Sequence, residues 1–96
     1  MKLNESEIAK NLETLPGWSV RKGSLVRLYE FKGFAEAVAF VDRIAQIAQR
    51  HNHHPDIDIR WNKVTLALVT HDEGGITGKD FLVAEECEQV YKTFKE

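Results

Sequence analysis

Residues 56–68 read DIDIRWNKVTLAL and contain two runs in which apolar and polar residues alternate. Such alternation, with a period of two residues, is typical of a β-strand that has one apolar face. Asn62 and Lys63 separate the runs, and a two-residue loop headed by Asn suits a tight hairpin turn. A turn at this place predicts apolar cross-strand pairs on one face of the sheet. The predicted pairs are Trp61 with Val64, Ile59 with Leu66, and Ile57 with Leu68.

A second hairpin is expected earlier in the chain. Trp18 and Val20 alternate with polar residues, residues 22–24 offer a turn, and residues 25–31 are rich in strand-forming side chains. We interpret residues 25–31 as the edge strand of the sheet, through which a second copy of the chain can pair.

Helices are predicted between and around the two hairpins. Residues 34–48 (FAEAVAFVDRIAQIA) contain eleven apolar residues among fifteen, which indicates a buried helix. Asn4 with Glu7, and Thr77 with Asp80, have the spacing of helix capping boxes. These two boxes predict a first helix near the start of the chain and a last helix after residue 77.

The predicted order of elements is therefore αββαββα. Adjacent hairpins imply a four-stranded antiparallel sheet, and the three helices can cover one of its faces, which defines a two-layer α+β fold. Ninety-six residues suffice for one hydrophobic core, so residues 1–96 are expected to form a single domain. Because helix 34–48 is apolar around most of its circumference, one sheet face cannot cover it, and we expect a homo-oligomer.

Composition and charge exclude several classes of protein. Thirteen Lys and Arg against fifteen Asp and Glu give a net charge of −2, the wrong sign for binding nucleic acid through many phosphates. The single cysteine, Cys87, cannot form a disulfide within the chain. The sequence contains no apolar signal core and no run long enough to span a membrane, so we expect a cytoplasmic protein that does not bind membranes.

All four histidines lie in the second half of the chain, at positions 51, 53, 54 and 71. The hairpin register above places His54 opposite His71 and His53 opposite Asp72, although Pro55 interrupts the ladder there. Histidine donates or accepts a proton near neutral pH, so the cluster predicts acid–base chemistry. A zinc site is the rival interpretation, but the standard ligand spacings are missing. For His51 we favour a surface position at a helix end.

Short motifs spread over nearly the whole chain carry a resemblance. They are Gly17-Trp18, Phe31-Lys32-Gly33-Phe34, His53-His54-Pro55, Trp61-Asn62-Lys63-Val64, Thr70-His71-Asp72, Gly75 and Asp80. Together they resemble the signature of the pterin-4a-carbinolamine dehydratase (4a-hydroxytetrahydrobiopterin dehydratase) family.

The resemblance implies dehydration of a 4a-hydroxytetrahydropterin to quinonoid dihydropterin and water, in pterin recycling, without a metal or an organic cofactor. It implies that His53, His54 and His71 are the catalytic residues: His53 and His71 form the acid–base pair, and His54 binds and orients the pterin and assists protonation. The further substrate-binding residues that it implies are Trp18, Asn52, Pro55, Thr70, Asp72 and Asp80. It also implies a homodimer or a homotetramer whose small-molecule partner is a pterin.

Other interpretations stand beside this one. A non-catalytic pterin-binding or protein-dimerisation module, whether a transcriptional cofactor or part of molybdenum-cofactor metabolism, needs the apolar helix but no facing histidines. Taken alone, Trp18 favours a core aromatic and Asp80 a helix cap. Gln49 departs from the family, in which this position is often acidic or otherwise charged. A neutral amide places no charge beside the imidazoles, so turnover or the pH optimum can differ.

Overall fold

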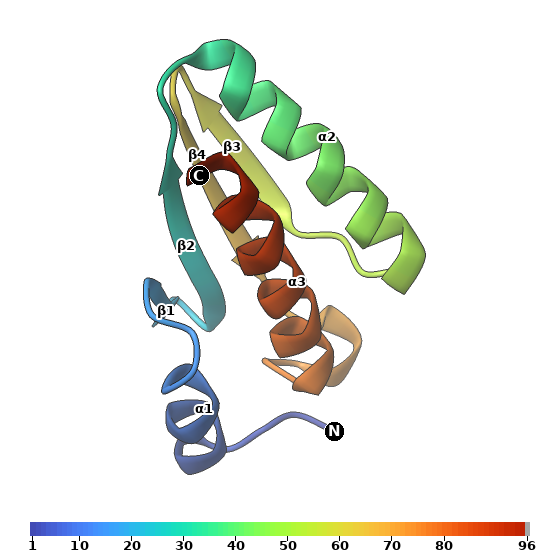
Figure 1. Cartoon of the computed structure of the whole chain (residues 1–96). Helices are drawn as coiled ribbons and strands as arrows, with labels where there is room; N and C mark the ends of the chain where they lie inside the picture. Colours follow the sequence, from blue (N-terminus) through green and yellow to red (C-terminus); the bar gives the residue numbers. More distant parts are fainter. Residues whose placement is uncertain (96) are drawn as a thin grey trace.

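The structure is a computed structural model that describes residues 1–95. The elements within these residues are α1 (Glu5–Leu12), β1 (Trp18–Arg21), β2 (Ser24–Glu30), α2 (Phe34–His51), β3 (Asp56–Arg60), β4 (Lys63–Leu68), the short 3-10 helix η1 (His71–Glu73) and α3 (Gly78–Lys95). The predicted αββαββα order and the α+β class are confirmed, and η1 is an addition to them (Figure 1).

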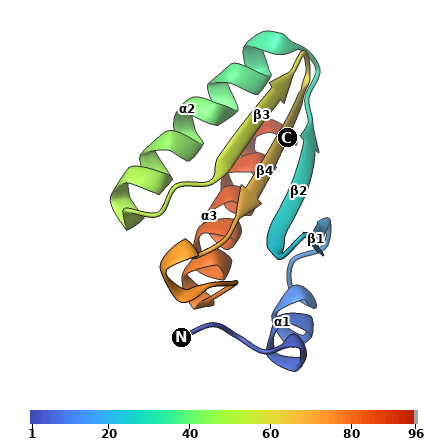
Figure 2. The same cartoon turned by 180° about the vertical axis from the view of Figure 1, so that it is seen from behind.

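The strands form one antiparallel sheet in the order β1-β2-β4-β3. Helices α2 and α3 lie side by side over one face of this sheet, as the front and back views show (Figure 1 and Figure 2). Helix α1 lies beyond the end of the sheet next to β1, so the cover consists of two helices rather than the expected three. The prediction that residues 25–31 form an edge strand is wrong, because β2 pairs with β1 on one side and β4 on the other.

The register of the β3–β4 hairpin differs by two residues from the predicted one. Ile57 pairs with Leu66 and Ile59 with Val64, so the turn is formed by Trp61 and residue 62 rather than by residues 62 and 63. Because the shift is even, the side chains within β3 and β4 stay on the faces predicted for them. Trp61 adopts the left-handed conformation with φ of 55° and its side chain is 69% exposed, so it pairs with no residue of β4.

A tertiary contact explains where this turn falls. Asn62 is buried, its side-chain Nδ2 donates a hydrogen bond to the Phe31 carbonyl at 2.9 Å, and its own carbonyl accepts one from the Phe31 N–H at 2.9 Å. Asn62 thus anchors the turn to the end of β2. The apolar face predicted for β3 is not buried within the chain, since Ile57 and Ile59 are 39% and 38% exposed.

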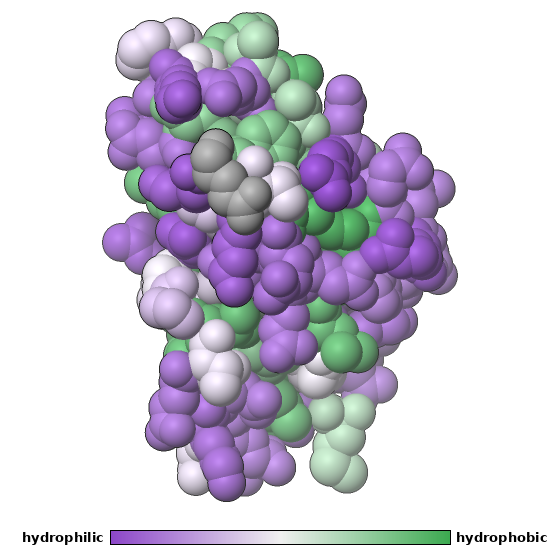
Figure 3. Space-filling view, in the orientation of Figure 1, coloured by the Kyte–Doolittle hydropathy of each residue, from purple (hydrophilic) through white to green (hydrophobic). Residues whose placement is uncertain are grey.

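The core lies between the sheet and the two covering helices. Its fully buried side chains include Leu25 and Tyr29 of β2, Val64, Leu66 and Leu68 of β4, Ala37, Phe40 and Ile44 of α2, and Val83, Ala84 and Cys87 of α3. Burial raises the pKa of the Cys87 thiol to about 12, so this thiol remains protonated and acts as a packing group. On the face that carries α3, polar residues cover most of the surface and apolar atoms show only between them (Figure 3).

The first predicted capping box is complete, and the second has one of its two reciprocal bonds, because the Thr77 hydroxyl accepts from the Lys79 N–H at 3.2 Å rather than from Asp80. The Asn4 side chain accepts from the Glu7 N–H at 2.8 Å, and the Glu7 carboxylate accepts from the Asn4 N–H at 2.9 Å. At the start of α3, Asp80 Oδ2 accepts from the Thr77 N–H at 2.8 Å. None of the helices within residues 1–95 has the length and the apolar character needed to cross a membrane.

Candidate functional site

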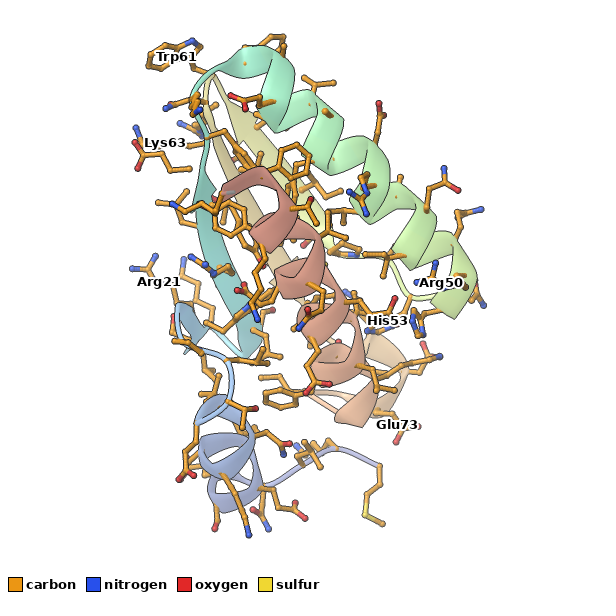
Figure 4. The ribbon with its side chains drawn as sticks, viewed as in Figure 1. Arg21, Arg50, His53, Trp61, Lys63 and Glu73 are labelled. Carbon is orange, nitrogen blue, oxygen red and sulfur yellow. The ribbon has the colours of Figure 1, made fainter. Side chains whose placement is uncertain are left out.

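Two chain segments meet at the end of the sheet that lies opposite the Trp61 turn. Helix α2 ends at His51, and Asn52 adopts the left-handed conformation that reverses the chain toward β3. Strand β4 ends at Leu68 and the chain continues through Thr70 into η1. Because β3 and β4 are antiparallel neighbours, the residues before β3 lie beside the residues after β4. Figure 4 shows His53 at this end of the molecule, between the end of α2 and the start of α3.

These segments enclose a cavity of about 340 Å³. The residues that line this histidine cavity are Asn52, His53, His54, Val69, Thr70, His71, Asp72 and Lys79. The structure therefore brings together His53, His54 and His71 from two separate segments. The predicted cross-strand pairing of His54 with His71 is wrong, because the β3–β4 ladder ends at Asp56 and Ala67 with a register shifted by two. The histidines meet around a cavity and not across a ladder.

His53 is held by a buried carboxylate. Its Nε2 lies 2.5 Å from Oδ1 of Asp80, whose side chain is fully buried. The second oxygen of Asp80 accepts from the Thr70 hydroxyl at 2.9 Å and from the Thr77 N–H at 2.8 Å. An ionised carboxylate only accepts hydrogen bonds, so Asp80 keeps the proton of neutral His53 on Nε2 and leaves Nδ1 as the acceptor. Asp80 thus combines the helix-cap role with a contact to the site.

His54 has a different kind of partner. Its Nε2 lies 2.8 Å from Oε1 of Gln49, in the last turns of α2. An amide carries both an acceptor and a donor, so Gln49 can turn over and bond to either tautomer of His54. His54 is also exposed, whereas His53 is buried. The two adjacent histidines therefore differ in how firmly their protons are placed.

Trp18 lies outside the histidine cavity. It is buried in the core, where its Nε1 donates to Oε2 of Glu88 at 2.8 Å and its ring meets Tyr29 edge to face. The same Glu88 oxygen accepts from Arg27 Nε at 2.9 Å and from the Tyr29 hydroxyl at 2.5 Å. Although burial opposes it, hydrogen bonds from Arg27, Tyr29 and Trp18 lower the pKa of Glu88 below its usual range. Within this subunit Trp18 is a core aromatic.

His51 also lies apart from the histidine cavity. It pairs with Glu86 of α3 at 2.5 Å, and Arg50 contacts the other oxygen of the same carboxylate. The hydrogen bonds from His51 and Arg50 lower the pKa of Glu86, against a smaller opposing effect of burial. This cluster fastens the end of α2 to α3 at the surface, in line with the prediction for His51.

The sequence did not single out Lys79, which lines the histidine cavity from the first turn of α3. The sequence signal that could have identified Lys79 is its position directly before Asp80. Pro55 and Asp80 lie next to lining residues in sequence or in space, but they are not part of the cavity wall. Among residues 1–95, no three His, Cys, Asp or Glu side chains gather closely enough to hold a metal ion.

A larger hollow, of about 530 Å³, lies between the α1–β1 loop and α3. Its lining includes Leu15, Pro16 and Leu82 together with the carboxylates Glu85 and Glu86, and none of the four histidines. By size alone, this larger hollow would be the better candidate for a ligand-binding site. The side chains that can transfer protons near neutral pH, however, line the smaller histidine cavity. We therefore take the histidine cavity as the candidate active site.

The fold and site define a class of protein: a small α+β protein with a histidine-lined cavity where an α2–β3 loop meets the end of β4. Residues 1–90 match the family model described as "Pterin 4 alpha carbinolamine dehydratase". A protein of Chloroflexus aurantiacus named "Putative pterin-4-alpha-carbinolamine dehydratase" is 46% identical over 89 residues, which cover 93% of this chain and 96% of that protein. The chain belongs to the pterin 4 alpha carbinolamine dehydratase family.

Solved structures agree with this assignment. A crystal structure described as "transcriptional coactivator/pterin dehydratase" from Brucella melitensis has a TM-score of 0.91 and 31% identity, and covers 95% of this chain and 99% of that one. A pterin dehydratase-like protein described as a RuBisCO assembly factor in the alpha-carboxysome has a TM-score of 0.64 at 19% identity, with 77% and 86% covered. The second likeness shows the fold alone.

Proposed function

We propose that this protein dehydrates a 4a-hydroxytetrahydropterin to quinonoid dihydropterin and water by histidine acid–base catalysis, in the recycling of pterin. The observation that carries the proposal is the convergence of His53, His54 and His71 on one cavity, with His53 held by buried Asp80. Membership of the family supports the choice of substrate.

The reaction requires two proton transfers. The hydroxyl at C4a leaves as water when a proton is delivered to its oxygen, and the proton on N5 departs to a base, so the substrate loses one water. In our proposal His53 and His71 are the acid–base pair, and the Nδ1 lone pair of His53 is available to accept a proton. His54 binds and orients the ring and assists protonation, Asn52, Thr70 and Asp72 line the cavity around the ring, and Pro55 follows His54 in the chain without lining the cavity. In our proposal these histidines carry out both proton transfers near neutral pH.

The first test compares histidines inside and outside the cavity. The substrate is generated in situ by a hydroxylase, and its decay is followed by ultraviolet absorbance with wild type, His71→Ala, His51→Ala or no protein. We expect wild type to accelerate the decay, His71→Ala to lose roughly 10²-fold or more of the acceleration, and His51→Ala to retain it. No acceleration by a protein whose circular dichroism shows it to be folded contradicts the proposal.

A role in protein assembly is the second candidate. Phe34 at the start of α2 is 56% exposed, and β3 leaves its outer edge and the side chains of Ile57 and Ile59 accessible. Exposed apolar side chains beside an unpaired strand edge favour pairing with another chain. The Brucella protein is described as both a coactivator and a dehydratase, which supports considering an assembly role beside catalysis for this chain.

We further propose that this surface forms a homodimer or a homotetramer, with β3 edges paired and α2 helices in contact. Light scattering at micromolar concentration tests this directly. Ile59→Lys is expected to shift the mass toward the monomer, because a charged edge strand resists pairing. Val20→Lys on the opposite edge strand β1 is the matched control. A monomeric wild type contradicts the oligomer.

A further inference from the structure

A second hollow adjoins the histidine cavity on the other side of His71. It has a volume of about 340 Å³. The residues that line this Lys22 hollow are Lys22, Gly23, Ser24, Val69, His71, Gly74 and Gly75. Val69 and His71 line both hollows, so a ligand that occupies the histidine cavity can extend past His71 into the Lys22 hollow.

The sheet explains this arrangement. Leu25 pairs with Leu68, so the beginning of β2 lies beside the end of β4. The β1–β2 turn therefore comes next to the segment that carries His71. Lys22 and Gly23 form this turn with φ values of 50° and 81°. On the other side, Thr70 bridges to Gly75, which folds the Gly74–Gly75 turn back toward the same place.

The lining of the Lys22 hollow has the chemistry of an anion site. Lys22, Ser24 and His71 are among its lining residues, and no Asp or Glu is. Glu73, which follows in the η1 turn, is engaged 2.9 Å from the N-terminal ammonium group of Met1. Ammonium and hydroxyl groups together bind phosphate or carboxylate oxygens through charge-assisted hydrogen bonds. This positive lining stands out in a chain whose net charge is −2.

Lys2 adds to the positive character. Its aliphatic stem packs against Gly75, where a Cβ atom would come within 3.1 Å of Lys2 Cδ. A side chain at position 75 would require this lysine stem to shift by a few tenths of an ångström. Gly75, which lines the Lys22 hollow, thus lets the Lys2 stem pack closely against it.

We propose that the Lys22 hollow binds an anionic substituent of the substrate ring, of the phosphate monoester type, while the ring occupies the histidine cavity. The proposal rests on the proposed function, because it assumes that a pterin ring lies among the histidines. It makes Lys22 a specificity-determining residue that contacts the substituent and takes no part in proton transfer.

Binding of three probes tests the proposal by calorimetry: pterin, which is the ring alone, neopterin, which adds a hydroxylated side chain, and neopterin phosphate. We expect neopterin phosphate to bind wild type about 5-fold more tightly than neopterin, the range of a partly exposed ion pair. Lys22→Gln is expected to remove this advantage without changing the affinity for pterin. Lys63→Gln, at the far hairpin, is the matched control and is expected to keep it. The advantage should also shrink as salt is raised.

The outcomes separate this inference from the function on which it rests. Equal affinity of wild type for neopterin and its phosphate overturns the inference, and so does a Lys22→Gln variant that weakens all three probes alike. If pterin binds and responds to His71→Ala, these results leave the proposed function standing. If pterin itself does not bind, the proposed function fails and the inference fails with it.

Discussion

Replacing Asp80 with Asn tests how His53 is held in the site. Asp80 is fully buried and accepts hydrogen bonds from His53 Nε2 at 2.5 Å, the Thr70 hydroxyl at 2.9 Å and the Thr77 N–H at 2.8 Å. Asn has nearly the same shape but presents one oxygen and one NH₂ group, so one position that accepted must now donate. His53 is the partner that can adapt, because its Nε2 can accept from the NH₂ group if the ring proton moves to Nδ1.

The expected effect on rate is larger than the effect on stability. Moving the proton to Nδ1 removes the lone pair that acts as the base in our proposal, and loss of a positioned base costs roughly 10²- to 10⁴-fold in rate. The oxygen of Asn can still bond to the Thr77 N–H, so the helix cap is partly kept. The lost cap and the weaker buried hydrogen bonds together cost about 1 to 3 kcal/mol of unfolding free energy.

Two measurements check the Asp80→Asn variant. The dehydratase assay gives kcat/KM, and the ¹⁵N chemical shifts of His53 report which ring nitrogen carries the proton. Thr70→Val, which removes one donor but leaves the carboxylate, is the matched comparison and is expected to keep the His53 tautomer. The reasoning is refuted if Asp80→Asn keeps wild-type kcat/KM, or if its His53 proton stays on Nε2 while activity falls.

Further predictions concern charges elsewhere in the chain. Gln49→Glu places a carboxylate 2.8 Å from His54, which favours the imidazolium, so the pH profile of kcat/KM should move up by roughly half a unit to one unit; an unmoved profile contradicts a role for Gln49. Glu88→Ala leaves the Arg27 guanidinium without its partner in a site where both side chains are less than one-fifth exposed; urea unfolding should show a loss of about 3 kcal/mol, and a loss below ~1 kcal/mol refutes it. Glu86→Gln should cost less than ~1 kcal/mol at pH 7, because the Glu86 side chain is 35% exposed and its partners His51 and Arg50 are 24% and 61% exposed. Because the folded-state pKa of Glu86 is lowered, this difference should vanish as pH falls below roughly 4, as unfolding at several pH values will show.

Local signals in the sequence predicted the elements well. Period-two alternation identified β3 and β4, the apolar run identified α2, and Asn4 and Thr77 marked the starts of helices. Each of these signals depends on contacts within a few residues. What failed depends on distant contacts: the turn moved to Trp61 because Asn62 is bonded to Phe31, which lies 31 positions earlier. The prediction that residues 25–31 form an edge strand failed for the same reason, since β2 pairs with β4 across the intervening α2 and β3.

The candidate site could be predicted in composition but not in geometry. His53, His54 and His71 were grouped by a hairpin register that the structure contradicts, and they meet because the ends of antiparallel neighbours necessarily adjoin. The three histidines are therefore close together, as predicted, but because of the antiparallel pairing of β3 and β4 and not because of the predicted register. The placement of Trp18 could not be read from nearby residues, because its partner Glu88 lies 70 positions away on α3.

In the proposed reaction, the different partners of the two adjacent histidines give these histidines different tasks. Asp80 lies on α3, and its bonds to Thr70 and Thr77 hold it rigidly, so His53 keeps one tautomer until it takes a second proton. Gln49 lies on α2 and bonds to whichever tautomer His54 presents, so proton placement on His54 follows the ligand rather than the protein. A dehydration needs a base that is ready before the substrate arrives and a ring contact that adjusts to both substrate and product. In our proposal Asp80 serves the first need and Gln49 the second, so we expect that exchanging these two partner types, Asp80→Asn with Gln49→Glu, will not restore activity.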